Sequence, residues 1–121
     1  MNFLVYAHDP EDYERWLSEN KAVPAAPTEP DAIAGRKTFL SLTCSQCHAI
    51  AGTGADRSIA PDLTHIASRA QLAAGVLKNT PENLRLWLKN PAAFKPGCKM
   101  PDFKLSDQQL DDLVAYLETL K

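Results

Sequence analysis

The chain has 121 residues, 45% of them apolar, and a formal net charge of −2 at pH 7. This length is below the usual size for two full domains, and the apolar fraction is ordinary for a globular protein. A charge so close to neutral gives no support for nucleic-acid binding. The sequence has no run approaching the roughly 20 apolar residues of a membrane span, and its first residues lack the pattern of a secretory signal.

The first thirty residues predict a strand, a helix and a linker. Residues 2–7 include the apolar run Phe3, Leu4, Val5 and Tyr6, which favours a short strand. Asp9 and Pro10 then form an N-cap and a first helical position, and the helix is expected to end near Asn20. One face of this helix carries Tyr13, Trp16 and Leu17. Residues 21–30 contain three prolines and few large apolar side chains, which predicts an extended linker.

A helix predicted from about Asp31 to Leu42 leads into the sequence Cys44-Ser45-Gln46-Cys47-His48. The C-x-x-C-H pattern is typical of c-type haem attachment, because each thiol can add to one vinyl group of the same porphyrin. His48 would then be the proximal ligand of the iron. Paired cysteines at this spacing also occur in thiol redox motifs and zinc sites. A zinc module that adds Cys98 and either His48 or His65 is therefore an alternative.

Met100 is the best candidate for the second axial ligand of a haem. The other candidates are Met1, His8 and His65. Met100 follows Pro96 and precedes Pro101, in a loop that can direct a thioether inward without helix geometry. A methionine that only fills a gap in the core is the alternative. His/Met ligation raises the reduction potential relative to His/His, which predicts high-potential electron transfer. An open sixth position would instead indicate a haem enzyme or a ligand sensor.

Three further helices are predicted after the motif. A short one spans about Leu63 to Leu77, a second is capped by Thr80 and stopped by Asn90-Pro91, and the last opens with a capping box at Ser106–Gln109. The inward face of the last helix carries Leu110, Leu113, Val114, Leu117 and Leu120. On that helix Tyr116 is expected to meet Gly35 and Phe39, because a glycine allows two helices to cross closely.

Three residues outside the motif are candidates for the surroundings of the haem. Pro61 and Leu63 are placed to line its proximal side, and the Pro61 carbonyl would accept the second N–H of His48 and fix the ring orientation. Trp87 would pack beside the haem and offer its indole N–H to a propionate. Ordinary core packing is the alternative for Trp87.

Together these residues resemble the class I cytochromes c, whose fold is all-α, with about four to five helices around one covalently bound haem c. The runs 60–69, 79–84, 95–97 and 113–117 narrow the resemblance to the cytochrome c domain of subunit II of caa-type haem-copper oxidases. That resemblance covers residues 31–121. Residues 1–20 are similar to the end of the copper-binding domain of that subunit, as a strand plus helix, and 21–30 is the linker between the two.

The resemblance implies a set of roles for residues of this chain. Cys44 and Cys47 would hold the haem, His48 and Met100 would ligate the iron, and Pro61 would support His48. Electrons would pass from a soluble donor protein to the dinuclear copper centre of subunit II and on to the oxygen-reducing site of subunit I. The chain itself would catalyse no bond-making step. A free-standing soluble monohaem carrier is the alternative.

Two positions depart from that family or leave alternatives open. Met1 falls where the family has a copper-ligating methionine, but it is equally an initiator residue, and the cysteines and histidines of a complete copper site are absent. Cys98 stands where the family usually has asparagine, and we expect it to be incidental. Because haem is attached outside the cytoplasm, we expect this chain to be an excerpt of a membrane-anchored protein or a processed form. It would then lie on the outer face of the membrane.

Charge is distributed unevenly along the chain. Residues 1–31 contain seven acids and two bases, whereas residues 32–121 contain eight acids and eleven bases. Four of these bases, Lys89, Lys95, Lys99 and Lys104, bracket Met100 in sequence. They are candidates for a basic rim that steers an acidic partner, and a solvated face of scattered lysines is the alternative.

Overall fold

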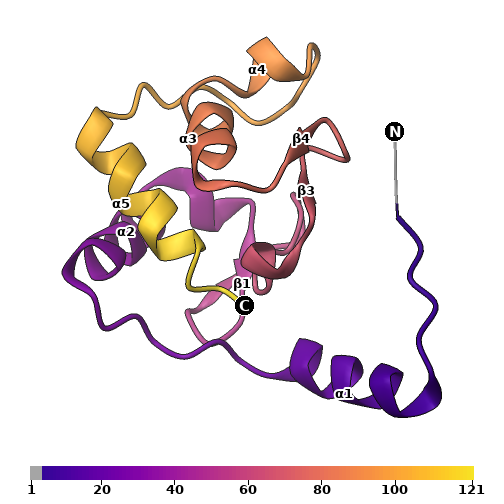
Figure 1. The fold of residues 1–121 in the computed structure, drawn as a ribbon. Helices are drawn as coiled ribbons and strands as arrows, with labels where there is room; N and C mark the ends of the chain where they lie inside the picture. The colour runs from indigo at the N-terminus through magenta and orange to yellow at the C-terminus, as the bar shows by residue number, and fades with distance from the viewer. Residues whose placement is uncertain (1–3) are drawn as a thin grey trace.

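The computed structural model describes residues 4–121, which form a mainly helical domain with a helical extension at its N-terminal side (Figure 1). Its helices are α1 (Pro10–Lys21), α2 (Pro30–Ser41), α3 (Pro81–Lys89), α4 (Pro91–Phe94) and α5 (Asp107–Leu117), with 3₁₀ helices η1 (Thr43–Gln46) and η2 (Ile66–Ser68). Two small antiparallel hairpins pair β1 (Ala49–Ile50) with β2 (Ala55–Asp56) and β3 (Gln71–Leu72) with β4 (Leu77–Lys78). None of the helices in this described part is long and apolar enough to cross a membrane.

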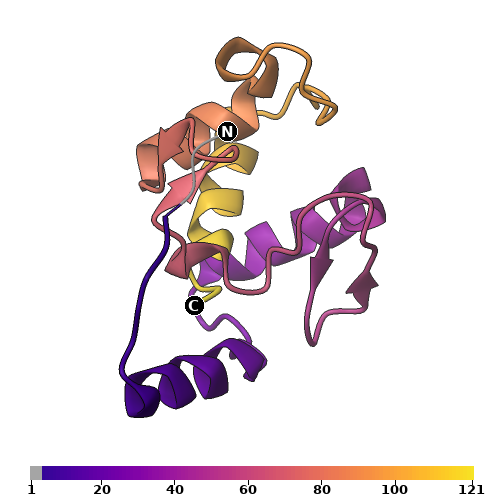
Figure 2. The ribbon, with the colours of Figure 1, turned by 90° about the vertical axis from the view of Figure 1, so that its right-hand side faces the viewer.

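Helices α2 and α5 cross in close contact, as predicted, and Figure 2 shows the crossing from the side. Gly35 lies at the crossing point. A methyl group there would overlap the backbone carbonyl of Asp112 and lie 2.7 Å from Cβ of Tyr116. One turn further along α2, the ring of Phe39 packs against Tyr116 with a centroid distance of 6.1 Å. The packing therefore depends on a residue without a side chain at position 35.

The inward face of α5 forms the centre of the core. All five predicted apolar residues of this helix and its end are buried, and Leu110 is fully inaccessible. The predicted capping box is also present: the Ser106 hydroxyl accepts from the Gln109 amide at 3.2 Å, and the Gln109 side chain accepts from the Ser106 amide at 2.9 Å. On the outer side, Arg85 of α3 bonds to both Asp107 and Asp111, at 2.7 and 2.6 Å. These bonds tie α3 to α5.

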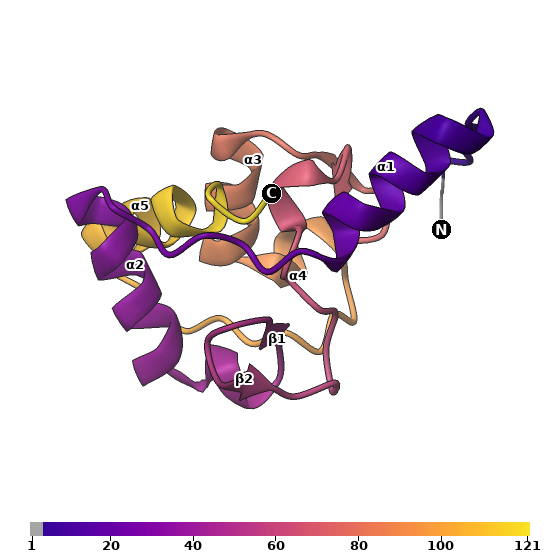
Figure 3. The same cartoon turned by 90° about the horizontal axis from the view of Figure 1, so that it is seen from below.

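The N-terminal extension agrees with the sequence in its helix but not in its strand. Helix α1 begins at Pro10 as predicted, yet it buries no residue, and Tyr13 and Trp16 remain almost half exposed. Figure 3 shows α1 reaching away from the other helices. Residues 4–9 form neither helix nor strand, because an isolated strand leaves its backbone groups unpaired. The remaining part of the predicted strand, and Met1, fall outside the described residues.

The predicted helix over 63–77 is wrong. Leu63 instead donates its amide to the Ala49 carbonyl at 2.8 Å, which holds the segment against β1. Three successive residues, Ala73 to Gly75, have positive φ angles of 54°, 63° and 91°. This left-handed run cannot continue a right-handed helix, and it forms the turn between β3 and β4. The Asn90-Pro91 pair stops α3 as predicted, but Pro91 also opens the short helix α4, which was not predicted from the sequence.

Candidate functional site

Helix α2 delivers the C-x-x-C-H motif into a tight turn. The Cys44 carbonyl accepts from the amides of both Cys47 and His48, at 3.1 and 2.9 Å. Within the described residues, Cys44 and Cys47 are free, half-buried thiols rather than a disulfide. Burial, with a smaller contribution from neighbouring Cys47, raises the pKa of the Cys44 thiol. Both sulfur atoms are therefore available for covalent attachment to one group.

The imidazole of His48 is fixed by the backbone of a distant loop. Its Nδ1–H donates to the Pro61 carbonyl at 2.7 Å, which is the predicted hydrogen bond. Two backbone hydrogen bonds, one on each side of Pro61, hold the loop close to the motif. The Ala60 amide donates to the Cys47 carbonyl, and the Leu63 amide donates to the Ala49 carbonyl. With Nδ1 occupied, Nε2 is the nitrogen that remains free to act as a ligand. Leu63 is buried in the core directly behind this loop.

A second set of polar contacts stabilises the Pro61 loop, and the sequence analysis did not find it. The Asp62 carboxylate accepts from the Thr64 amide at 2.7 Å, and the Thr64 hydroxyl accepts from the Ala51 amide at 3.0 Å. Partial burial acts to raise the pKa of Asp62, but the bonds from Thr64 and the charge of Arg69 lower it overall. These contacts join segments on both sides of the loop, so only the folded chain reveals them.

Met100 occupies the edge of the same core. Its side chain is half-buried and packs against the core cluster, as do those of Cys44 and Leu105. The loop before it turns at Gly97, where φ is +80°, with the Cys98 amide bonded to the Lys95 carbonyl at 3.0 Å. Cys98 is another free, half-buried thiol.

Trp87 lies half-buried on α3, between the buried residues Leu84 and Leu88 in the sequence. Its indole N–H takes part in none of the hydrogen bonds found over residues 4–121. The group is therefore available to an acceptor that the protein itself does not supply.

The donor set matches the chemistry of a covalently attached haem. Two free thiols are available to form thioether bonds, one imidazole has its Nδ1 engaged, and one thioether sulfur is partly buried. The zinc alternative lacks such support, because no three His, Cys, Asp or Glu side chains in the described range are grouped to hold a metal ion. His65 keeps its Nε2 atom buried and without a hydrogen-bond partner among these residues.

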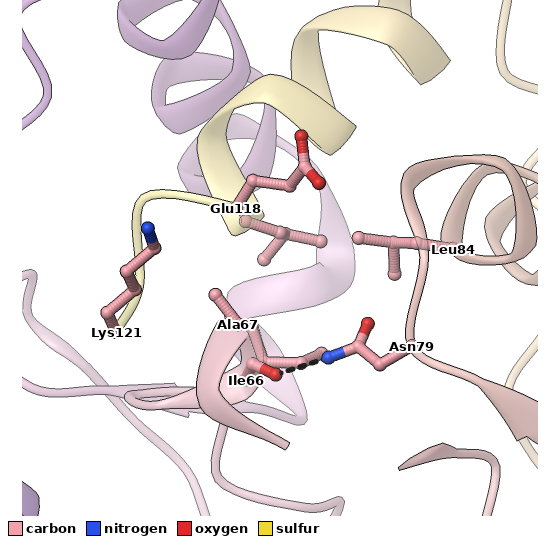
Figure 4. Close-up of a pocket in the computed structure, with 7 residues that line it drawn as sticks. Ile66, Ala67, Asn79, Leu84, Glu118 and Lys121 are labelled. Carbon is pink, nitrogen blue, oxygen red and sulfur yellow. Dashed lines mark hydrogen bonds between the residues drawn. The ribbon is translucent and has the colours of Figure 1, made fainter. Parts of the chain in front are cut away.

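Two cavities lie elsewhere in the fold. One of about 260 Å³ is lined by residues of η2, α3 and the end of the chain, and Figure 4 shows Asn79 on its wall donating to the Ile66 carbonyl at 2.7 Å. A wider groove of about 550 Å³ lies between the linker, at Ala26 and Pro27, and α2. Neither cavity is lined by Met100 or by a residue of the C-x-x-C-H motif.

The four lysines that bracket Met100 are all exposed. Lys104 pairs with Asp102, its Nζ lying 2.7 Å from the carboxylate. In the structure from residue 4 onward, Lys89, Lys95 and Lys99 take part in no ion pair. Three exposed lysines without a close ion pair within the described residues thus lie in and near the Met100 loop, although Lys89 is near enough to Asp107 to lower the pKa of that carboxyl.

Comparisons with known proteins agree with this site. The family model described as Cytochrome c matches residues 32–121. Over its whole length the chain is 35% identical to cytochrome c oxidase subunit 2 of Alkalihalophilus pseudofirmus and 34% identical to that of Bacillus sp. strain PS3, and it spans 35% of each relative. Cytochrome c2 of Rhodospirillum rubrum is 33% identical over 116 residues, which cover 77% of this chain and all of that relative.

Proposed function

Because the chain belongs to the cytochrome c family, we propose that it transfers electrons through one haem c, as a domain of subunit II of a caa-type cytochrome c oxidase. Cys44 and Cys47 would attach the haem covalently, and His48 and Met100 would ligate its iron. The bound haem supplies a reversible one-electron couple. The protein contributes attachment, ligand orientation and a largely apolar environment.

The observation that carries this proposal is the hydrogen bond between His48 and Pro61. The Nδ1–H of His48 donates to the Pro61 carbonyl at 2.7 Å. This contact selects one tautomer, leaves the lone pair of Nε2 unprotonated, and increases the basicity of the ring. A histidine next to two free thiols and fixed in this way is suited to bind iron. A surface histidine with no such role would have no need of a fixed tautomer.

Met100 provides the complementary ligand. Its sulfur is a soft donor on a side chain that already packs against the same core cluster as Cys44. His/Met ligation favours the reduced iron relative to His/His ligation, so the couple is expected to be of high potential. Leu63 would add an apolar contact on the His48 side of the bound haem, and the indole N–H of Trp87 would donate to a haem propionate.

The assignment to an oxidase rests on the extension before the haem domain. Residues 1–31 lie outside the family model, yet the alignment with the oxidase subunits runs over the whole chain. We divide the chain into a copper-domain-like end (1–20), a linker (21–30) and a cytochrome c domain (31–121). The chain spans about one third of those relatives, so the dinuclear copper domain, subunit I and the soluble donor are proposed partners. Its proposed location is the outer face of the membrane.

A free-standing carrier is the second candidate, because cytochrome c2 aligns over its full length with this chain. The two functions share the iron site and differ in the acceptor. They are distinguished by whether the extension is needed for electron delivery to copper.

The first test is the absorption spectrum of the purified haem-loaded protein in both redox states. We expect a low-spin c-type spectrum with the weak far-red band of methionine bound to Fe(III), and loss of that band in Met100→Ala. His8→Ala removes another candidate ligand, on an exposed residue of the extension, and as the control it should retain the band. Absence of haem, or a high-spin spectrum without the band, would contradict the ligand assignment.

The second test follows electrons in the assembled oxidase that contains this chain. Rapid mixing with a reduced donor should first reduce the haem of this domain. Its reoxidation should then proceed at the rate at which the copper centre is reduced. Cys44→Ala combined with Cys47→Ala should abolish donor oxidation but leave turnover with a small artificial reductant of the copper centre. Unchanged donor oxidation in this variant would exclude the domain from the route.

A further inference from the structure

The segment that follows Met100 is pinned to the core at two points. Met100 and Leu105 both pack against the core cluster. Four residues connect them, and among these Lys104 adopts a left-handed backbone with φ of +53°. A non-glycine residue adopts this conformation at a cost in free energy, and it persists where surrounding contacts favour it.

Asp102 makes the contacts that favour this turn. One carboxylate oxygen accepts from the Lys104 backbone amide at 2.9 Å, and the other lies 2.7 Å from Lys104 Nζ. The Asp102 side chain is only 28% exposed, whereas that of Lys104 is 84% exposed. The carboxylate is therefore held against the backbone of Lys104, where it restricts the path of the chain between the two anchored side chains.

We propose that Asp102 is a positioning residue for Met100: by closing the turn at Lys104 it sets the length and direction of the loop that presents the methionine sulfur. This inference rests on the proposed function, in which Met100 is an axial ligand. Without the turn, the chain between Met100 and Leu105 gains conformational freedom. Met100 then spends more time away from its site, although the core itself is unchanged.

The test measures how readily added imidazole displaces Met100 from the ferric haem-loaded protein. An external ligand binds only the fraction of molecules in which Met100 has moved away, so its apparent affinity reports that fraction. Asp102→Ala should raise the apparent imidazole affinity about fivefold, the effect expected for one lost hydrogen bond. Loss of the far-red methionine band provides the spectroscopic readout.

Two variants distinguish the effect of the hydrogen bond to the Lys104 amide from that of the Asp102–Lys104 ion pair. Asp102→Asn keeps an oxygen for the Lys104 amide but loses the ion pair, and it should bind imidazole as the wild type does. Lys104→Gly also removes the ion pair, and glycine adopts the left-handed backbone freely, so it should behave in the same way. Either variant binding imidazole as tightly as Asp102→Ala would overturn the role assigned to the turn.

Asp107→Asn is the matched control. It removes an exposed carboxylate that also forms a 2.7 Å ion pair, but this pair joins α5 to Arg85. Its imidazole affinity should equal that of the wild type. An equal rise in imidazole affinity in Asp107→Asn and Asp102→Ala would indicate a general loss of stability and would overturn the role assigned to Asp102. Equal affinity in Asp102→Ala and wild type, with the methionine band intact, would overturn this proposal alone. A wild type without the band would contradict the ligand assignment itself.

Discussion

The backbone of α2 at Gly35 approaches α5 so closely that a methyl group at this position would lie 2.7 Å from Cβ of Tyr116 and would overlap the Asp112 carbonyl. Helix α2 leads directly into Cys44, and α5 contributes buried residues to the core that Met100 packs against. The crossing therefore joins the segment that carries the C-x-x-C-H motif to the core at Met100.

Gly35→Ala should destabilise the haem-loaded protein by about 1–3 kcal/mol, because the helices must separate to accommodate the methyl group. Urea unfolding provides the measurement. Gly54→Ala is the control, since nothing lies within 4 Å of the added atom there and only its φ of +82° is unfavourable. A loss at Gly35 no greater than that at Gly54 would show that the crossing tolerates separation.

The ion pairs of Arg85 should make stability depend on pH in the acidic range. Hydrogen bonding to Arg85 lowers the pKa of Asp107. A carboxyl whose folded pKa is lowered stabilises the fold above its unfolded pKa, which is about 3.9 for Asp, and loses this effect as pH falls through the folded value.

Wild type should therefore be more stable than Asp107→Asn at pH 7, and the difference should vanish as the pH falls below the folded pKa. Denaturant unfolding across this range measures it. A difference that stays constant with pH would show that the carboxylate contributes through packing or hydrogen bonding alone. Asp56→Asn serves as the control, because Asp56 is exposed and 3.8 Å from Arg57.

The hydroxyl of Tyr116 is dispensable, but its ring is not. Burial raises the pKa of this hydroxyl, and nearby Arg36 opposes the shift. The oxygen nonetheless satisfies no hydrogen-bond geometry with any described residue. Tyr116→Phe should change the free energy of unfolding by no more than about 0.5 kcal/mol.

Tyr116→Ala should instead cost about 3–5 kcal/mol, because it empties the space against Phe39. Thermal or urea unfolding of the haem-loaded variants distinguishes the two effects. A loss above about 1 kcal/mol in Tyr116→Phe would indicate that Arg36 or a water molecule bonds to the hydroxyl.

Titration of free thiols should show how many cysteines are bonded to the haem. All three cysteines are free in the protein chain. Attachment consumes Cys44 and Cys47, so the denatured haem-loaded protein should react at a single thiol, and Cys98→Ser should react at none. Haem content and the visible spectrum of Cys98→Ser should match wild type. Loss of the methionine band in this variant would show that Cys98 supports the Met100 loop.

Much of the fold was predictable because its signals are local. The caps at Thr80 and Ser106, the proline at position 10 and the periodic leucines of α5 each act within one or two turns of a helix. The hydrogen bond from His48 to Pro61 was also predicted. The C-x-x-C-H motif identifies its own chemistry, since its spacing is dictated by the porphyrin.

The errors occurred where distant segments decide the structure. The alanine-rich stretch at 73–74 favours a helix by propensity, but backbone bonds to β1 and the hairpin turn impose another path. The contacts of Asp62 and Thr64 join loops that are separate in sequence. The strand was expected over residues 2–7. Neither hairpin in the described residues pairs with that segment, and its own sequence pattern does not show whether a neighbouring strand is available.

The crossing of α2 and α5 joins the first and last helices of the haem domain, so its contacts are among the most distant along the chain. Such contacts form late in folding, since a long loop must close before they are made. The C-x-x-C-H turn follows α2 directly. A chain in which this crossing has not yet formed therefore leaves the core beside the two thiols open, and docking of the last helix closes it.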